Sequence, residues 1–122
     1  MDPEATVRAF CNAVEARDVE QLVGFFSSDA VYHNIPIAPV KGREAIGTTL
    51  KAFIGPASEA EFEIVALACS GNSVLTERLD RFVIGGKKIE LPVMGTFEVT
   101  PSGEISAWRD YFDMASFTKQ MG

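Results

Sequence analysis

The sequence has few of the residues from which metal sites and disulfides are built. It contains one histidine, His33, and two cysteines, Cys11 and Cys69, which show no motif spacing. A His/Cys metal cluster therefore cannot be assembled, and no metal site is expected. Both cysteines lie in apolar segments, so buried free thiols are predicted in place of a disulfide.

Basic clusters and long apolar runs are also missing. The formal net charge is −6, and Lys87-Lys88 is the longest basic run. This balance argues against nucleic acid and anionic membranes as partners. No apolar run approaches the roughly 18 residues that a membrane-spanning helix needs. The N-terminal stretch MDPEATVRAF lacks the basic start and apolar centre of a signal peptide, so a cytoplasmic location is expected.

What the chain does have is apolar residues, which make up 47% of its 122 residues and include nine Phe. This composition argues against disorder. It predicts a single domain over residues 1–122 with a core of substantial size.

Helical spacing of the apolar residues dominates the first part of the chain. Asp2 is expected to cap a first helix, and Asp18 a second one that reaches Phe26. A short strand is predicted over 30–35, followed by a third helix over 42–53.

Alternating apolar and polar residues dominate the rest. Strands are predicted over 61–70, 73–84, 87–100 and 104–112, joined by short turns. Asp113 is expected to cap a final short helix. This order is typical of the α+β class, in which helices on one face of a strongly curved sheet form a cone with an apolar interior.

The strand over 73–84 carries a charged pair on an apolar face. A period of two places Arg78 and Asp80 between Val74 and Phe82. Burying two charges is costly unless they pair with each other or take part in chemistry. Considered alone, this pair favours a structural ion pair.

Two other strands also place polar side chains on one face. Tyr32 and Asn34 share a face of the first strand, and Asp110 lies between Trp108 and Phe112 on the last. An inward carboxylate among aromatic rings is expected to have a raised pKa unless donors surround it. Each residue also has a structural interpretation, as a core tyrosine, a strand-ending amide or a buried ion pair. Polar residues directed inward from three strands favour a functional site.

Three motifs, in this order along the chain, resemble those of the limonene-1,2-epoxide hydrolases. They are YHNIP at 32–36, LTERLD at 75–80 and WRDYFD at 108–113. The similarity includes the MGTF segment at 94–97 and covers nearly the whole chain. It implies a curved mixed sheet of the nuclear transport factor 2-like, SnoaL-like or cystatin-like kind, with helices packed over it. It also implies a homodimer.

The resemblance implies roles for five residues. Asp110 would be the general base that deprotonates a water molecule held by Tyr32 and Asn34. Asp80 would be the general acid that protonates the epoxide oxygen, and Arg78 would bridge the two carboxylates.

The chemistry is consistent with these residue types. Opening an epoxide needs a nucleophile at carbon and a proton on the leaving oxygen, so no metal or organic cofactor is expected. Two carboxyls with a guanidinium between them can share one proton, which supplies an acid and a base at one pH. The predicted reaction is a one-step anti addition of water that gives a vicinal diol without an ester intermediate.

A lipophilic substrate, such as a cyclic or terpene-like epoxide, is expected from the apolar residues predicted to surround the site. These predicted substrate-binding residues are Val14, Phe53, Phe82, Leu91, Val93, Phe112 and Phe117.

Two other functions stay open at this point. A tyrosine and two aspartates in an apolar cone also build sites of the ketosteroid-isomerase-like isomerases and cyclases. Arg78 argues against that function, because a cation beside Asp80 opposes the neutral state that an oxyanion donor needs. The other alternative is a non-catalytic domain that binds a small apolar ligand.

Overall fold

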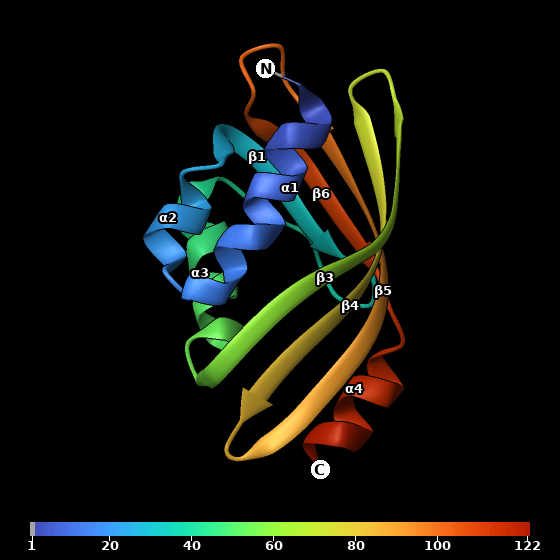
Figure 1. Ribbon diagram of the computed structural model, residues 1–122. Helices are drawn as coiled ribbons and strands as arrows, with labels where there is room; N and C mark the ends of the chain where they lie inside the picture. The colour runs from blue at the N-terminus through green and yellow to red at the C-terminus, as the bar shows by residue number, and fades with distance from the viewer. Residues whose placement is uncertain (1) are drawn as a thin grey trace.

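The computed structural model describes residues 2–122. Helices and strands follow one another in the order shown by the colours of Figure 1. They are α1 (Pro3–Ala13), the 3-10 turn η1 (Val14–Ala16), α2 (Val19–Val23), β1 (Phe26–Asn34), β2 (Val40–Lys41), α3 (Arg43–Ile54), β3 (Ala57–Ser70), β4 (Ser73–Ile84), β5 (Lys87–Val99), β6 (Ile105–Tyr111) and α4 (Met114–Met121). Within residues 2–122, no helix is both long and apolar enough to cross a membrane.

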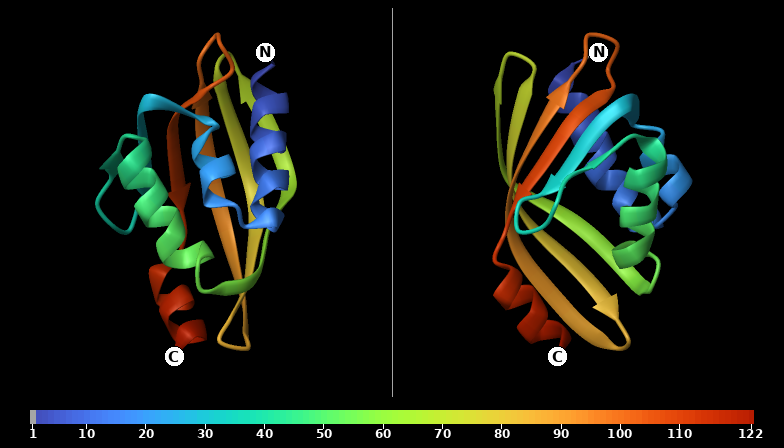
Figure 2. Two further views of the ribbon diagram at one scale, coloured as in Figure 1. Left: turned by 90° about the vertical axis from the view of Figure 1, so that its left-hand side faces the viewer. Right: turned by 180° about the vertical axis from the view of Figure 1, so that it is seen from behind.

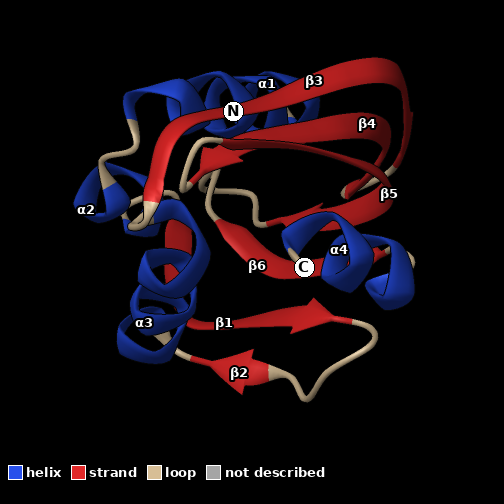
Figure 3. Cartoon of the chain, turned by 90° about the horizontal axis from the view of Figure 1, so that it is seen from below, coloured by secondary structure: helices blue, strands red, loops and turns tan. Residues whose placement is uncertain are grey.

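The six strands form one sheet in the order β2-β1-β6-β5-β4-β3. β1 and β6 run parallel and the other neighbours run antiparallel, so the sheet is mixed. Helices α1, α2 and α3 lie against one face of this sheet, and α4 lies beside β5 (Figure 2). Figure 3 shows the sheet curving from β3 round to β1 and β2. The predicted α+β class and the curved mixed sheet are confirmed.

Three helices begin at the predicted caps. The side chains of Asp2, Asp18 and Asp113 each accept a hydrogen bond from a backbone N–H in the first turn of α1, α2 and α4. Each carboxylate satisfies a donor that has no partner inside the helix, and its charge favours the positive end of the helix dipole.

Aromatic rings fill the space between α1 and the sheet. Phe10 of α1 meets Phe25, Phe26, Phe97 and Trp108 edge to face, at centroid distances of 5.6, 5.4, 5.9 and 5.0 Å. Edge-to-face packing is favoured because the positive ring edge meets the negative ring face. This cluster excludes water from the inner face of β5 and β6, which carries the polar residues described below.

The alternation predicted for β4 is confirmed. Val74, Thr76, Arg78, Asp80 and Phe82 are all buried on the inner face. The residues between them are exposed or half-buried. A strand with two ionisable side chains on its inner face therefore crosses the middle of the domain.

Two strands begin earlier than the sequence predicted. α2 ends at Val23, and β1 begins at Phe26, where a helix was expected. Phe26 pairs with Ile105 of β6, a contact between distant parts of the chain that overrides the local helical pattern. β3 begins at Ala57 because that residue pairs with Ile84, the last residue of β4. The short strand β2 was not predicted.

The two cysteines have different environments. Cys11 lies on the buried face of α1, as predicted. The prediction that Cys69 is buried is wrong, because its side chain is exposed. Cys69 lies one residue before the end of β3, an edge strand whose last residues are exposed. Both are free thiols, and burial raises the pKa of Cys11 to about 12.

Candidate active site

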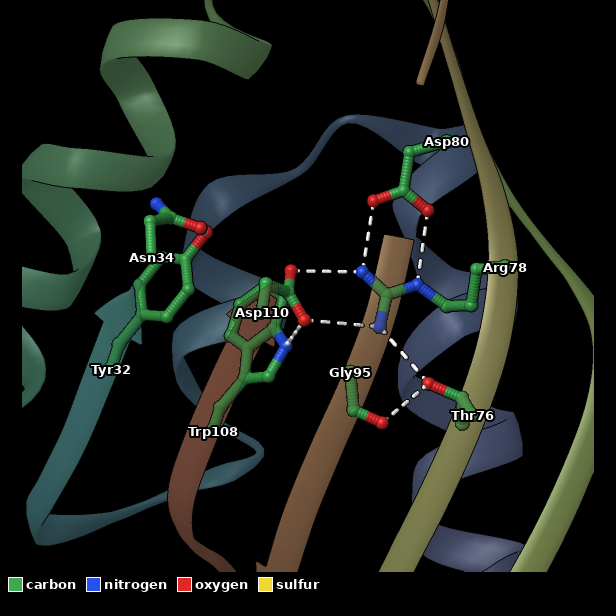
Figure 4. A network of polar contacts seen from close by, with 8 residues as sticks. All are labelled: Tyr32, Asn34, Thr76, Arg78, Asp80, Gly95, Trp108 and Asp110. Carbon is green, nitrogen blue, oxygen red and sulfur yellow. Dashed lines mark hydrogen bonds and ion pairs between the residues drawn. The ribbon is translucent and has the colours of Figure 1, made fainter. Parts of the chain in front are cut away.

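A buried arginine lies between two aspartates that come from different strands (Figure 4). Arg78 and Asp80 belong to β4, and Asp110 belongs to β6, with β5 between them. Arg78 is long enough to reach across β5, so its guanidinium contacts both carboxylates at 2.8 Å. Sequence alternation predicted which face each residue occupies, and the sheet brings them together.

All five N–H groups of Arg78 have an acceptor. Nε and Nη2 donate to the two carboxylate oxygens of Asp80 at 3.0 and 2.8 Å. Nη1 and Nη2 donate to Oδ1 and Oδ2 of Asp110 at 3.2 and 2.8 Å. The second N–H of Nη1 donates to the hydroxyl of Thr76 at 3.1 Å, and that hydroxyl donates to the Gly95 carbonyl at 2.9 Å. A guanidinium has no further donors, so none is left unsatisfied.

Gly95 makes room for this network. It lies on β5, paired with Thr76 on one side and Asp110 on the other. A β-carbon at this position would collide with Nη1 of Arg78 and Oδ1 of Asp110. Glycine is required here because two charged groups meet directly over the backbone.

Burial and charge act against each other in this network. The side chains of Arg78, Asp80 and Asp110 are only 0%, 6% and 5% exposed. Burial raises the pKa of Asp80 to about 6, the charge and hydrogen bonds of Arg78 oppose the rise, and the charge of Asp110 adds to it. Burial would lower the pKa of Arg78, but the two carboxylates outweigh it and raise that pKa well above its ordinary value. Arg78 therefore stays charged.

Two stacked aromatic rings, Trp108 and Tyr32, lie beside Asp110. The indole Nε1–H of Trp108 donates to Oδ1 of Asp110 at 2.7 Å. The Tyr32 ring stacks on the Trp108 ring at 3.9 Å, with 7° between the planes. The hydroxyl of Tyr32 donates to Oδ1 of Asn34 at 3.1 Å. Burial, and then the charge of Asp110, raise the pKa of Tyr32 well above its ordinary value, so the phenol stays neutral.

The two carboxylates open onto a cavity of about 230 Å³. Its polar lining consists of Tyr32, Asn34, Thr49, Asp80 and Asp110. The remaining lining is apolar and consists of Ile37, Ala52, Phe53, Phe62, Phe82, Leu91, Val93, Phe112, Met114 and Phe117. Arg78 lies behind the carboxylates and does not line the cavity. The cavity can therefore hold a mostly apolar molecule against two carboxyl groups.

Most of the predicted site residues meet here. Tyr32, Asn34, Arg78, Asp80 and Asp110 form one cluster. Six of the seven predicted apolar residues line the cavity, namely Phe53, Phe82, Leu91, Val93, Phe112 and Phe117. Val14 does not line it, because the 3-10 turn η1 directs this side chain into the core, where it is 0% exposed.

Three residues that complete the network were not among the predicted site residues. Thr76 and Trp108 each precede a charged residue by two positions, so they share its face and can reach its side chain. Gly95 occupies an inward position in an otherwise alternating strand, which is a signal of close approach. These positions are visible in the sequence. The contacts that these residues make across neighbouring strands are not.

The other ion pairs within residues 2–122 are more exposed than the Arg78 network. A wider surface groove of about 800 Å³ is lined largely by polar residues, among them Arg81 and Lys88. The Arg81 guanidinium is already paired with Glu61, Glu63 and Glu90. Among residues 2–122, no group of three or more His, Cys, Asp and Glu side chains is arranged to hold a metal ion.

Comparisons with known proteins show the family of this chain. The family model described as limonene-1,2-epoxide hydrolase catalytic domain matches residues 1–122. Epoxide hydrolase EphG of Mycobacterium tuberculosis is 34% identical over 113 residues, which are 93% of this chain and 74% of that protein.

Solved structures share the fold. The structure of an M. tuberculosis LEH-like epoxide hydrolase has a TM-score of 0.82 and 34% identity, and the match covers 95% of this chain and 86% of that one. A protein of Shewanella denitrificans OS-217 described as SnoaL-like polyketide cyclase has a TM-score of 0.87 and 16% identity, with coverage of 98% and 96%. At 16% identity, that likeness concerns the fold alone.

The raised pKa of Asp80 predicts how stability depends on pH. A carboxyl whose pKa rises from 3.8 to about 6 on folding binds its proton more tightly in the folded state. The free energy of unfolding should therefore fall as pH rises through this window, by about 1–3 kcal/mol relative to an Asp80→Asn variant, which lacks this titration. Urea unfolding of both proteins at several pH values measures the difference. A difference that is constant or that grows with pH would contradict the prediction.

Proposed function

Because the chain belongs to the limonene-1,2-epoxide hydrolase family, it is a hydrolase that acts on epoxides, and we propose that it adds water to a lipophilic epoxide in one general acid–base step. The observation that carries the proposal is the shared guanidinium. Arg78 donates two N–H groups to each carboxylate, so Asp80 and Asp110 are held beside the same cavity. A base and an acid can then act on one substrate from fixed positions.

Asp110 is proposed as the base. A water molecule beside Asp110, Tyr32 and Asn34 could donate one proton to the carboxylate. The Tyr32 hydroxyl directs its own proton to Asn34, so its oxygen is free to accept a hydrogen bond from the same water. The amide N–H groups of Asn34 can donate to that water. This arrangement orients a lone pair of the water toward the substrate carbon.

Asp80 is proposed as the acid. Its pKa of about 6, raised by burial, lets it hold a proton near neutral pH more readily than an exposed aspartate does. As the water oxygen bonds to the epoxide carbon, the C–O bond to the epoxide oxygen breaks, and that oxygen takes the proton of Asp80. The products are a vicinal diol, a protonated Asp110 and an ionised Asp80. A proton must then return from Asp110 to Asp80 before the next turnover.

The cavity lining supports the proposed class of substrate. Ten of its fifteen residues are apolar, including five phenylalanines, and they leave about 230 Å³. A cyclic or terpene-like epoxide offers apolar surface to these side chains and one oxygen to Asp80. The ketosteroid-isomerase-like alternative is disfavoured, because the family model that matches the whole chain is that of the limonene-1,2-epoxide hydrolases.

The acid and the base can be tested separately. Asp110→Asn and Asp80→Asn should each lower diol formation by at least about 10³-fold, because each removes one of two coupled proton transfers. The assay would follow diol formation over a panel from cyclohexene oxide to terpene and fatty epoxides, with circular dichroism as the check on folding. Glu20→Gln, at an exposed position of α2, is the matched control and should keep full activity. Substantial turnover in either aspartate variant would refute the assignment.

The direct attack by water has its own test. In a single turnover in ¹⁸O-labelled water, with enzyme in excess over epoxide, the label should enter the diol and leave the protein unlabelled. An ester intermediate would instead place ¹⁸O in an aspartate carboxyl after turnover. Mass spectrometry of the peptides that contain Asp80 and Asp110 distinguishes the two routes, and label in either aspartate would exclude the one-step mechanism.

We also propose that the protein forms a homodimer through the outer face of its sheet. Helices cover the inner face, whereas the outer face exposes Leu75, Met94 and Tyr111 at 44%, 53% and 49%. Met94 and Tyr111 are paired across β5 and β6, so these two exposed apolar side chains are neighbours. Large apolar side chains that are about half exposed and grouped on one face favour an interface.

The dimer is tested by mass in solution. Light scattering on a size-exclusion column should give about twice the 13.2 kDa of one chain. Met94→Glu should reduce this mass to that of a monomer, because it would bury two carboxylates in the interface. Exchanging the exposed Lys51, which lies on α3 away from this face, for Glu is the control and should leave the mass unchanged. A monomeric parent protein would rule the proposal out.

A further inference from the structure

Asp80 and Asp110 accept the same number of hydrogen bonds from Arg78, but only Asp110 accepts another one from the rest of the network. Arg78 donates two N–H groups to Asp80, at 3.0 and 2.8 Å, and two to Asp110, at 3.2 and 2.8 Å. The guanidinium therefore does not by itself decide which of the two holds a shared proton. The additional donor is the indole N–H of Trp108, which contacts Asp110 alone at 2.7 Å.

We infer that Trp108 is a positioning residue that assigns the shared proton to Asp80, and thereby makes Asp110 the base and Asp80 the acid. The inference rests on the proposed function, since it concerns the roles of the same two carboxyls. An N–H group stabilises an ionised carboxylate more than a protonated one, because the proton reduces the negative charge on the acceptor oxygen. With three N–H donors against two, Asp110 keeps its charge and the proton stays on Asp80.

The other groups that face Asp110 do not supply a competing donor. Asp80 and Arg78 face it from β4, Tyr32 from β1 and Cys11 from α1. The hydroxyl of Tyr32 donates to Asn34. Arg78 contributes equally to both carboxylates, as described above. Within residues 2–122, no hydrogen bond from Cys11 reaches either carboxylate, and burial keeps its thiol neutral with a pKa of about 12.

Trp108 acts through Asp110 and not on the substrate. Its side chain is fully buried, with 0% exposed, and it does not line the cavity. Its ring is also held in place from the other side, because Phe97 stacks on it with 14° between the planes. The Tyr32 ring stacks on the Trp108 ring at 3.9 Å. Trp108 therefore contacts both Asp110, the proposed base, and Tyr32, which is proposed to hold the water (Figure 4).

The sequence makes this inference unusually accessible to experiment, because the chain has one tryptophan. Biosynthetic replacement of tryptophan by 3-benzothienylalanine changes only Trp108, keeps the fused ring and puts a sulfur in place of the N–H. In this protein the acid limb of the kcat/KM profile should move to higher pH by about one unit, and the plateau should fall about tenfold. A purely structural tryptophan would leave the position of the acid limb unchanged.

A second readout does not depend on turnover. With ¹³Cγ-labelled aspartate, the carboxyl signals of Asp80 and Asp110, assigned through the Asn variants, report which of them is protonated. In the parent protein the signal of Asp80 should titrate near neutral pH, and in the benzothienyl protein the protonated carboxyl should become Asp110. Phe26→Leu, which alters the packing against the Trp108 ring without touching its N–H, is the matched control and should leave both signals in place.

These outcomes separate the inference from the proposed function. If the parent protein turns over no epoxide but the proton moves between the carboxyls as stated, the proposed function fails and the role of Trp108 holds. If the benzothienyl protein does not fold, the indole ¹H–¹⁵N signal of the unmodified protein decides, since it should shift with the titration of the carboxyl pair. An unmoved acid limb with unmoved carboxyl signals, or an indole signal that ignores pH, would overturn the inference.

Discussion

The structure depends on one buried cation. A fully buried guanidinium is tolerated only when its charge is compensated and each N–H has an acceptor, because desolvation of an unpaired charge costs several kcal/mol or more. Arg78 meets this condition with two carboxylates and one hydroxyl. Removing any acceptor would leave a buried donor unsatisfied, so the residues around Arg78 constrain one another.

That requirement explains features of the domain that look unrelated in the sequence. The Arg78 side chain must cross β5, which lies between β4 and β6, to reach Asp110. β5 therefore has a glycine, Gly95, at the crossing. The fifth N–H needs an acceptor on the same face, which Thr76 provides two residues earlier on β4. The guanidinium also lies over the Phe62 ring at 4.8 Å, where the negative face of the ring favours a cation.

The buried carboxyl pair can also hold a proton that is available for chemistry. A cation alone between two equal carboxylates would hold both of them ionised, whereas burial favours keeping one proton within the pair. In the proposed mechanism this pair supplies an acid and a base beside one cavity, with Arg78 behind them. The aromatic rings that exclude water from this region also strengthen its electrostatic interactions, because the local dielectric constant is low.

The sequence by itself determined the class of fold, most element boundaries and the composition of the site. A side-chain period of two in a strand is a local property, so it placed Arg78 with Asp80, and Tyr32 with Asn34, on single faces. Only the tertiary structure decided which strands are neighbours and in what register. It set Gly95 opposite Asp110, extended β1 back to Phe26 and directed Val14 into the core and away from the cavity. These features come from contacts between distant segments, whose register no local periodicity contains.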